Sequence, residues 1–354
     1  MSSSSSELKP ELDRGEQLAG WTIIRRIGSG GFGTVYEVEK DGQRAAMKTE
    51  YVYEKHSEAL RNEVKQLRLL QYSPHFCRLF LACRQIYKNE SYVNVMVMQL
   101  VGRSLSALRK QMPKQLFTQE TSIRLAKQCL QGLQDMHSLG LIHRDVKAAN
   151  FAWNPEDRRV YLLDLGFCRR YLDVTKTAEG LLQARHRPAR RRLPFSGTEK
   201  YCSVNVHNRV EQSRRDDLWS WIYTTVEFLV GRLKWAEYKE HEVYRRKQAA
   251  GSALFLNCPC QLINCYDHIR FLHYESRPDY DLLHRQLNRA LKEMNVKETD
   301  PMDWELGGCQ FEWLRNQKQV KKKNEEEKKL KEIHIVSWET SSIRSDNSQS
   351  MRVQ

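Results

Sequence analysis

The chain has 354 residues, of which 40% are hydrophobic and 29% are charged, and this balance excludes a disordered or a membrane-embedded chain. Its 58 Lys and Arg residues outnumber its 44 Asp and Glu residues, so the formal net charge is +14 at pH 7. This excess favours an anionic partner, and composition alone leaves nucleic acid, an acidic membrane surface and an acidic peptide open.

Three features predict a protein that stays inside the cell. Residues 1–6 are one methionine and five serines, without the apolar segment of a secretory signal. The nine cysteines are scattered, which suits free thiols better than a disulfide framework. The longest mostly apolar stretch, Leu218–Val230, is shorter than the roughly 20 residues that span a bilayer. We therefore predict a cytoplasmic protein, with a nuclear fraction allowed and no membrane partner.

The N-terminal part of the chain predicts a small β-rich lobe. Residues 1–17 are rich in serine and predict a disordered tail. From Trp21 to Lys48, β-forming residues alternate with glycines and a turn, which is typical of a β-meander. Apolar residues at helical spacing predict a helix over Ser57–Leu70, and a further strand is predicted over Tyr92–Leu100.

The rest of the chain predicts a larger helical lobe. Thr118 as an N-cap and Gly140 just past the end predict a helix over Gln119–Ser138. The helix predicted over Asp217–Val230 is apolar nearly all round, so we expect it at the centre of the lobe. Residues 313–354 are charged and then polar, which predicts an exposed helix and a disordered tail. The expected fold class is therefore α+β with two lobes.

A glycine-rich turn between two predicted strands begins a series of motifs. Gly28 to Val35 holds four glycines whose backbone amides could close over phosphates, although such a turn by itself is more often a plain hairpin. Lys48 ends a predicted strand, and Glu63 lies in the helix predicted next. The lysine could hold phosphates while the glutamate fixes it by an ion pair, or both could be surface residues.

The segment from His143 to Asn150 is the most specific motif. It places Asp145, Lys147 and Asn150 at fixed offsets after the capped helix, and Asp164 follows an apolar strand-like segment. Phosphoryl transfer needs positioning and charge neutralisation more than covalent chemistry, and this set could supply both. Asp145 would accept the proton of a substrate hydroxyl, and Lys147 would steady the γ-phosphate. Asn150 and Asp164 would bind Mg²⁺.

With these motifs the chain resembles protein kinases, and four further segments make it similar to the casein kinase one group and most of all to the tau-tubulin kinases. Met98–Arg109 looks like the hinge of that family, and Gly197–Asn205 resembles the group's substitute for the usual Ala-Pro-Glu motif. Arg214–Ser220 and Asp300–Glu305 also resemble tau-tubulin kinases.

The resemblance implies a kinase domain over residues 18–312, with an N-lobe at 18–98, a hinge at 99–102 and a C-lobe at 103–312. Between the lobes ATP would bind with Mg²⁺ and give its γ-phosphate to Ser or Thr of a protein, with Met98 as gatekeeper. The residues expected to bind ATP are Ile27, Gly28, Ser29, Gly30, Gly31, Phe32, Gly33, Val35, Ala46, Lys48, Glu63, Met98, Gln99, Leu100 and Val101.

The resemblance also implies substrates that are acidic or already phosphorylated, which would suit the positive net charge. Lys200 sits where the group keeps a basic residue that receives such an anion, and Arg246 is a second candidate. Thr198 would contact the catalytic residues Asp145 and Lys147. Asp217 would hold the backbone of the catalytic loop.

Other interpretations stay open at this stage. A pseudokinase or scaffold would use the same fold without chemistry. The basic segment Arg185–Arg192 could dock on the cytoskeleton or another polyanion, or be a solvated loop; no motif that reads nucleic acid stands out. Cys258, Cys260, Cys265 and His268 could offer zinc ligands, but their spacing suits neither a ribbon nor a finger, so buried free cysteines are preferred. We expect a monomer.

Overall fold

The computed structural model describes residues 11–30, 33–52, 59–87, 91–176, 182–320 and 325. Gly31 and Phe32, which were predicted to bind ATP, lie outside these residues, as do most of the two predicted tails. The chain divides into two compact units: Met1–Lys110 with Lys114–Glu298, and Gln111–Pro113 with Thr299–Gln354.

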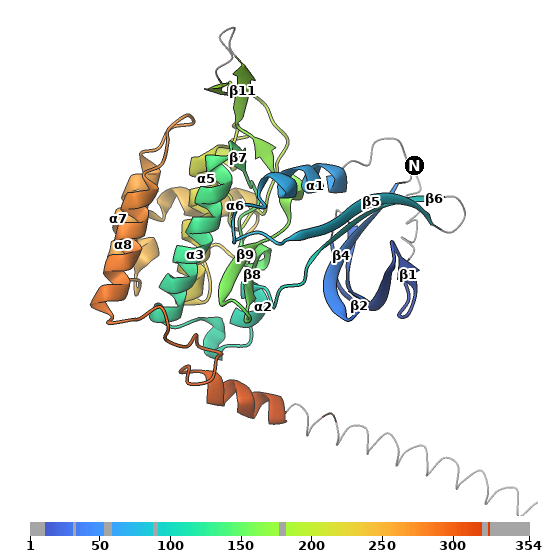
Figure 1. Cartoon of the computed structure of the whole chain (residues 1–354). Helices are drawn as coiled ribbons and strands as arrows, with labels where there is room; N and C mark the ends of the chain where they lie inside the picture. Colours follow the sequence, from blue (N-terminus) through green and yellow to red (C-terminus); the bar gives the residue numbers. More distant parts are fainter. Residues whose placement is uncertain are drawn as a thin grey trace, which may run out of the picture. The chain divides into compact units, whose positions relative to one another are not determined.

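The first part of the larger unit is a six-stranded antiparallel sheet that curls on itself (Figure 1). Its strand order is β1-β2-β3-β4-β6-β5, so the three strands of the predicted meander are neighbours. The strand bounds are β1 Gln17–Leu18, β2 Trp21–Gly30, β3 Gly33–Lys40, β4 Gln43–Val52, β5 Leu79–Tyr87 and β6 Ser91–Gln99.

One face of this sheet encloses a hydrophobic core. Side chains alternate between the two faces of a strand, so Tyr36 and Val38 of β3 point to the same side, as do Val93, Val95 and Val97 of β6. All five are buried in one cluster. Among the intervening residues, Val35 of β3, Lys48 of β4 and Met98 of β6 line the cleft described below.

Helix α1 (Ala59–Leu69) contacts β5 and β6. Leu60, Val64 and Leu67 are buried at the helical spacing that predicted this element; residues 57 and 58 of the predicted span lie outside the described part. Glu63 is buried on the same helix, which is unusual for a carboxylate without a partner. Glu63 lines the cleft described below.

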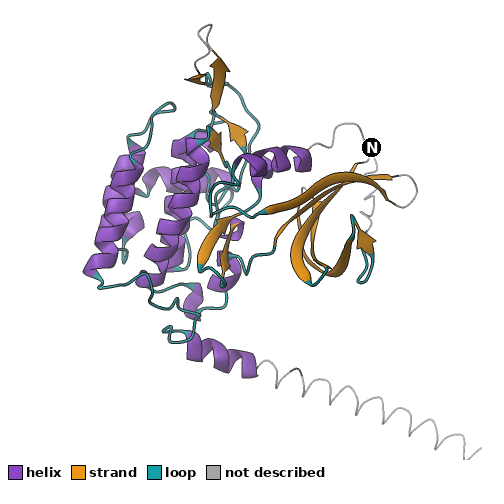
Figure 2. Ribbon diagram, in the orientation of Figure 1, coloured by secondary structure: helices purple, strands orange, loops and turns teal. Residues whose placement is uncertain are grey.

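The remaining residues of the larger unit are mainly helical, and Figure 2 shows the helices gathered apart from the curled sheet. Helix α3 (Gln119–Ser138) has the predicted bounds. The Thr118 side chain accepts a hydrogen bond from the Thr121 N–H at 3.3 Å, and Gly140 follows the end of the helix with φ +74°. The boundary signals read from the sequence are confirmed.

Helix α5 (Arg214–Val230) is buried along most of its length, as its apolar circumference predicted. The Trp221 indole N–H donates to the Ala126 carbonyl of α3 at 2.9 Å, which joins the two central helices. The predicted start of α5 at Asp217 was wrong by three residues. The Asp216 carboxylate accepts the Ser213 backbone N–H at 2.8 Å, so capping extends the helix through charged residues that carry no apolar periodicity.

Shorter elements complete the described chain. Three two-stranded sheets pair β7 with β10, β8 with β9 and β11 with β12. In the smaller unit, residues 311–320 are helical, which agrees with the helix expected after residue 313. The remaining bounds are α2 Leu105–Arg109, η1 Pro113–Gln115, β7 Leu141–Ile142, η2 Ala148–Asn150, β8 Phe151–Asn154, β9 Arg159–Leu162, η3 Leu165–Phe167, β10 Arg169–Arg170, β11 Leu172–Lys176, β12 Leu182–His186, α4 Val204–His207, α6 Glu240–Ala249, η4 Gly251–Phe255, α7 Gln261–Arg270 and α8 Tyr280–Glu293.

The division into a β-rich part and a helical part confirms the α+β class predicted from the sequence. Within the described ranges, every helix is too short or too polar to cross a bilayer.

Candidate active site

A cleft of about 380 Å³ lies between the sheet and the helical part of the larger unit. Twelve of the residues predicted to bind ATP line it. The twelve are Ile27, Gly28, Ser29, Gly33, Val35, Ala46, Lys48, Glu63, Met98, Gln99, Leu100 and Val101.

Four residues that line the cleft were not among the predicted site residues, although Gly102 belongs to the predicted hinge. Gly102, Ala149 and Leu163 each adjoin a predicted residue, so proximity to a motif was a usable signal for them. Cys77 lies between α1 and β5 and reaches the cleft only through the fold, without any motif around it. Burial raises the pKa of its thiol to about 12, so this side chain acts as a small apolar group.

The glycine-rich turn is a hairpin in which Gly30 pairs with Gly33 across β2 and β3. Gly33 has φ +133°, and a Cβ atom there would lie 2.0 Å from the Thr49 carbonyl oxygen of β4. Only glycine fits this backbone and this approach. A Cβ atom added at Gly28 would meet no atom within 4 Å, so close packing does not require a glycine at that position.

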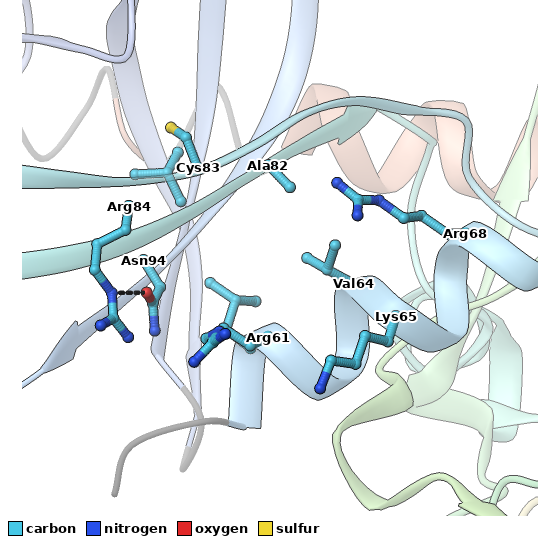
Figure 3. A pocket seen from close by; sticks show the side chains of 10 residues that line it. Arg61, Val64, Lys65, Arg68, Ala82, Cys83, Arg84 and Asn94 are labelled. Carbon is cyan, nitrogen blue, oxygen red and sulfur yellow. Dashed lines mark hydrogen bonds between the residues drawn. The ribbon is translucent and has the colours of Figure 1, made fainter. Parts of the chain in front are cut away.

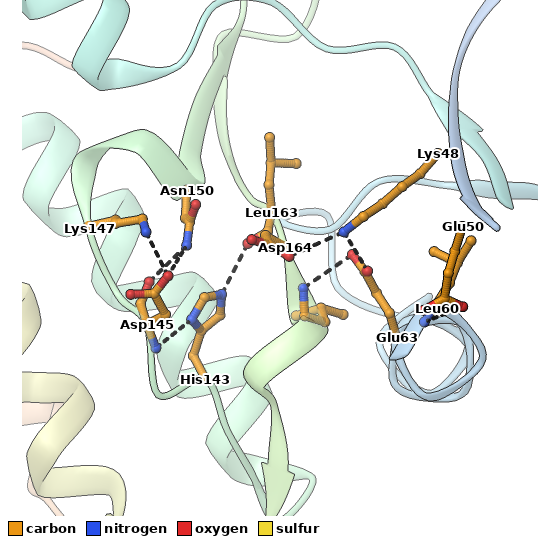
Figure 4. Close-up of polar contacts among 11 residues, drawn as sticks. Lys48, Glu50, Leu60, Glu63, His143, Asp145, Lys147, Asn150, Leu163 and Asp164 are labelled. Carbon is orange, nitrogen blue, oxygen red and sulfur yellow. Dashed lines mark hydrogen bonds and ion pairs between the residues drawn. The ribbon is translucent and has the colours of Figure 1, made fainter. Parts of the chain in front are cut away.

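Lys48 of β4 is held between two carboxylates inside the cleft (Figure 4). Its Nζ lies 2.6 Å from Glu63 Oε2 and 3.2 Å from Asp164 Oδ1. Burial alone would lower the pKa of Lys48, but the two carboxylates outweigh it and raise that pKa. The buried glutamate of α1 is thus explained by this ion pair, and the lysine is fixed as a cation.

Asp164 follows β9 and has a left-handed backbone conformation, with φ 61° and ψ 76°. Non-glycine residues seldom adopt this conformation, and those that do are often at functional sites. Burial would raise the pKa of Asp164, but Lys48 and then His143 outweigh it and lower that pKa. The carboxylate is therefore kept ionised, as a cation ligand must be.

Asp145 is the centre of a second set of polar contacts. Its Oδ1 accepts the Thr198 hydroxyl at 2.6 Å, and its Oδ2 lies 2.7 Å from Lys147 Nζ. Lys147 Nζ also donates to Thr198 Oγ1 at 2.8 Å, which closes a triangle of the kind that the resemblance implied. Asn150 Nδ2 donates to the Asp145 carbonyl at 2.8 Å, and the contacts of Asp145 with Lys147 and Asn150 are visible in Figure 4.

Asp217 at the start of α5 holds the loop that carries Asp145. Its carboxylate accepts the backbone N–H of His143 at 2.7 Å and of Arg144 at 2.8 Å, and it lies 2.9 Å from His137 Nε2. Arg144 has φ 71°, so the carboxylate stabilises a left-handed turn within the loop that leads to Asp145. Burial would raise the pKa of Asp217, but hydrogen bonding and charge from His137 lower it.

Lys200, the first candidate for an anion site, pairs with the fully buried Glu227 of α5. The same carboxylate accepts the Tyr201 hydroxyl at 2.8 Å and lies 3.3 Å from Arg109 Nη2. Arg246, the second candidate, pairs with Glu242 at 2.9 Å. Both cations are therefore engaged by carboxylates within the described chain, which leaves less of their charge for a substrate.

Lys247, next to Arg246, was not singled out from the sequence. It is buried, and its Nζ donates to the carbonyls of Glu199 and Cys202 at 2.6 Å each. It thereby clamps the segment around Lys200 from α6. Burial lowers the pKa of Lys247 to about 8, and no feature of the basic run around it distinguishes a buried lysine from an exposed one.

Two arginines of the basic segment Arg185–Arg192 form ion pairs within the protein. Arg187 pairs with Asp173 at 2.7 Å, and Arg190 pairs with the buried Glu211 at 2.5 Å. Arg185, Arg191 and Arg192 are exposed.

The cysteine cluster spreads over different environments. Cys265 is buried, Cys258 is partly buried and Cys260 is exposed. Within the described ranges, no three or more His, Cys, Asp and Glu side chains are grouped so that they could hold a metal ion.

Comparison with known proteins gives one family. The family model described as protein kinase domain matches residues 21–293. A probable serine/threonine-protein kinase of Dictyostelium discoideum is 36% identical over 293 residues, which cover 81% of this chain but only 56% of that relative. The Caenorhabditis elegans serine/threonine-protein kinase spe-6 is 31% identical over 299 residues, covering 80% of this chain and 75% of the relative. A C. elegans protein provisionally named a casein kinase I is 32% identical over 303 residues, covering 81% and 84%.

Proposed function

Because the chain belongs to the protein kinase family, we propose that it transfers the γ-phosphate of ATP to serine or threonine of protein substrates. The names of its relatives support serine and threonine as acceptors. We place the kinase domain at residues 18–312, with the N-lobe, hinge and C-lobe at the bounds given above. The match over residues 21–293 supports this span.

One observation carries the proposal. Lys48, Asp145 and Asp164 lie in one site, and the two aspartates have different hydrogen-bond partners (Figure 4). Lys48 is held by Glu63 and Asp164, while Asp145 is held by Lys147 and Thr198. Phosphoryl transfer requires a cation that binds phosphates and, separately, a carboxylate that orients the acceptor hydroxyl. A scaffold that only binds partners requires neither.

The residues divide the reaction as follows. Lys48 holds the α- and β-phosphates, and the amides of the glycine-rich hairpin cover them. Asp145 orients the substrate hydroxyl and takes its proton as the oxygen bonds to the γ-phosphorus. The bond from that phosphorus to the β,γ-bridging oxygen breaks, and ADP leaves. Lys147 neutralises charge on the transferred group, and Met98 to Val101 bind adenine by the hinge.

Asp164 and Asn150 fit the requirements of Mg²⁺. The Asn150 amide nitrogen is used by the Asp145 carbonyl, which leaves its amide oxygen for a cation. Mg²⁺ takes oxygen ligands and is commonly held by one or two protein groups together with substrate phosphates. When bound, the ion would neutralise charge that develops on the β- and γ-phosphates.

We further propose that the chain is a divergent member of the casein kinase one group, similar to the tau-tubulin kinases, and prefers acidic or phosphorylated sites. The relative provisionally named a casein kinase I supports the group. The substrate residues would be Thr198, Lys200 and Arg246. Because Lys200 and Arg246 already pair with carboxylates, we expect the preference for a phosphorylated site to be modest.

Three finer proposals complete this assignment. The chain acts as a monomer in the cytoplasm, with a nuclear fraction. Its exposed Arg185, Arg191 and Arg192 offer a docking point for an acidic cytoskeletal surface, since Arg187 and Arg190 are paired internally. Sedimentation of the chain with microtubules, before and after these three arginines are changed to serine, would test the docking.

The first experiment compares radiolabelled ATP transfer by the wild type and by Asp145→Asn, with Mg²⁺, onto casein and a phosphorylated acidic peptide. Loss of the general base is expected to lower turnover by about 10² to 10⁴-fold. The amide is nearly isosteric with the carboxylate, so thermal unfolding should change little.

Transfer that persists unchanged in Asp145→Asn would refute the assignment of the base. If the wild type binds ATP but transfers no label, the scaffold alternative would take its place.

A further inference from the structure

The proposed substrate residues Thr198 and Lys200 lie in one short segment, Thr198–Cys202, just before α4. The Thr198 hydroxyl donates to Asp145 at 2.6 Å, so the position of this segment decides how its residues meet the proposed catalytic base. The segment consists of turns and bends, without helix or strand. Its backbone carbonyls therefore need hydrogen-bond donors from other parts of the chain. We call this segment the acceptor turn.

Lys247 of α6 holds the acceptor turn on both sides of Lys200. Its Nζ donates to the carbonyls of Glu199 and Cys202 at 2.6 Å each. The Trp235 indole N–H donates to the carbonyl of Lys200 itself at 2.8 Å. Two side chains from beyond α5 thus bind three carbonyls of the turn, and one of these side chains is a cation.

The surroundings of Lys247 show how a cation is held there. The residue is only 5% exposed, and its Nζ lies 3.3 Å from Nε2 of His207. Burial and then the charge of Lys247 lower the pKa of His207 to about 4, so this ring is neutral at pH 7 and its Nε2 can accept a hydrogen bond. The rings of Tyr223 and Trp235 lie 5.5 and 5.8 Å from Nζ. All three N–H groups of the ammonium therefore have acceptors, namely two carbonyls and one ring nitrogen.

We propose, on the basis of the proposed kinase function, that Lys247 is a positioning residue for the acceptor substrate. By holding the acceptor turn, it keeps Thr198 on Asp145 and lowers the KM for the protein substrate. Packing alone would be served by an apolar side chain, whereas the burial of a cation costs free energy that its hydrogen bonds must offset. In the ATP cleft, Lys48 is held by Glu63 and Asp164 instead. We therefore expect Lys247 to affect the KM for ATP much less.

The charge of Lys247 gives this positioning a pH dependence. Burial lowers the pKa of Lys247 to about 8, against the opposing effects of Cys202 and Glu199 in the turn. The other titratable groups that face it are His207 of α4, which is neutral at pH 7, and Tyr223 of α5. Burial raises the pKa of Cys202 to about 11 and also raises that of Tyr223, so both stay neutral as Lys247 titrates. A neutral amine makes weaker hydrogen bonds to carbonyls than an ammonium does, so the hold on the turn should weaken as the pH rises through 8.

The test measures the KM for casein and the KM for ATP separately, with the full chain and radiolabelled ATP. Lys247→Met keeps the length of the side chain and removes its donors. We expect it to raise the KM for casein at pH 7 by about fivefold or more and to change the KM for ATP by less than about twofold. The matched control is Lys292→Met, which removes an exposed cation of α8 and should change neither constant.

A pH series separates positioning from packing. The wild-type KM for casein should rise by about threefold between pH 7 and pH 9, with its midpoint near 8. Lys247→Met should lack this step. Lys247→Arg keeps its charge at every pH of the series, so it should lack the step and stay closer to the wild-type value at pH 7. The same step in Lys247→Met would overturn the proposal, as would an unchanged KM for casein or an equal rise in the KM for ATP.

Hydrogen exchange tests the hold on the turn without any phosphate transfer. The amides of Tyr201 and Cys202 donate to the Thr198 carbonyl at 2.9 and 3.0 Å. After correction for the intrinsic exchange rate, their protection in the wild type should fall between pH 7 and pH 9, while that of α5 should not. Constant protection of the turn would refute the role of Lys247. This measurement also decides the question if Lys247→Met does not fold.

The two proposals fail in different ways. If the proposed kinase activity is wrong, the wild type labels no casein at any pH, and hydrogen exchange still reports on the acceptor turn. If only the positioning is wrong, the wild type labels casein and Lys247→Met does so with the same KM.

Discussion

Helix α1 borders two hollows of similar volume, and they treat charge in opposite ways. In the ATP cleft, Lys48 and Glu63 are buried and paired with each other. In the second hollow, of about 390 Å³ between α1 and the strands β5 and β6, Lys65 and Arg68 are exposed (Figure 3). Removing a charge from water costs free energy unless an opposite charge compensates. A buried ion therefore needs a counterion in the folded protein, whereas an exposed ion is stabilised by water. One helix thus serves fixed chemistry on one side and offers open charge on the other.

The largest effect should come from the backbone of the cleft. Gly33→Ala places a Cβ 2.0 Å from the Thr49 carbonyl at φ +133°, so we expect the free energy of unfolding to fall by about 3 kcal/mol. Gly28→Ala is the control, because a Cβ there meets no atom within 4 Å. Urea denaturation measures both. Equal losses of stability in the two variants would contradict a specific requirement for glycine at position 33.

Paired and exposed lysines should differ next. Lys48→Met leaves Glu63 buried without its cation, and we expect the free energy of unfolding to fall by about 1–3 kcal/mol, since Glu63 can relieve part of the cost by taking a proton. Lys65→Met removes an exposed cation of the second hollow and should change stability by less than about 0.5 kcal/mol. Urea denaturation measures both variants. Equal losses in the free energy of unfolding would contradict the difference between the buried and the exposed lysine.

The smallest effect concerns two cysteines, Cys77 and Cys83. Cys77 of the cleft is 2% exposed, whereas Cys83 of β5 packs against the core of the sheet and is partly exposed. Burial raises the pKa of both thiols, so alkylation of Cys83 by iodoacetamide should still accelerate as the pH rises past 9, where an ordinary thiol is half ionised. Mass spectrometry should find Cys83 modified before Cys77. Faster labelling of Cys77 would show that the cleft opens more readily than the surroundings of Cys83.

Much of the fold could be predicted because its signals are local. The cap of α3 at Thr118 and the apolar circumference of α5 are properties of a few consecutive residues, and the two-lobed α+β kinase fold expected from the motifs is confirmed. The start of α5 was missed because Asp216 caps it from within a charged run. Hydrophobic periodicity carries no information about such a start.

The candidate site was predictable to the extent that its residues lie in ordered motifs. Gly102, Ala149 and Leu163 adjoin such motifs, but Cys77 enters the cleft only through tertiary packing. The basic residues Lys65 and Arg68 of α1 could be seen in the sequence, whereas their meeting with Arg84 of β5 depends on how helix and sheet pack. Contacts between elements far apart in the chain cannot be predicted from the local patterns of a single sequence.

The buried carboxylate of Glu227 ties together three donors from two other segments: Arg109, Lys200 and Tyr201. Two oxygens serve all three, so exchange of Lys200 for a neutral residue would strip a cation from an acid that has no access to water. Replacement of Lys200 is therefore constrained by folding, and a lineage in which this lysine changes would be expected to alter Glu227 or Arg109 in the same step.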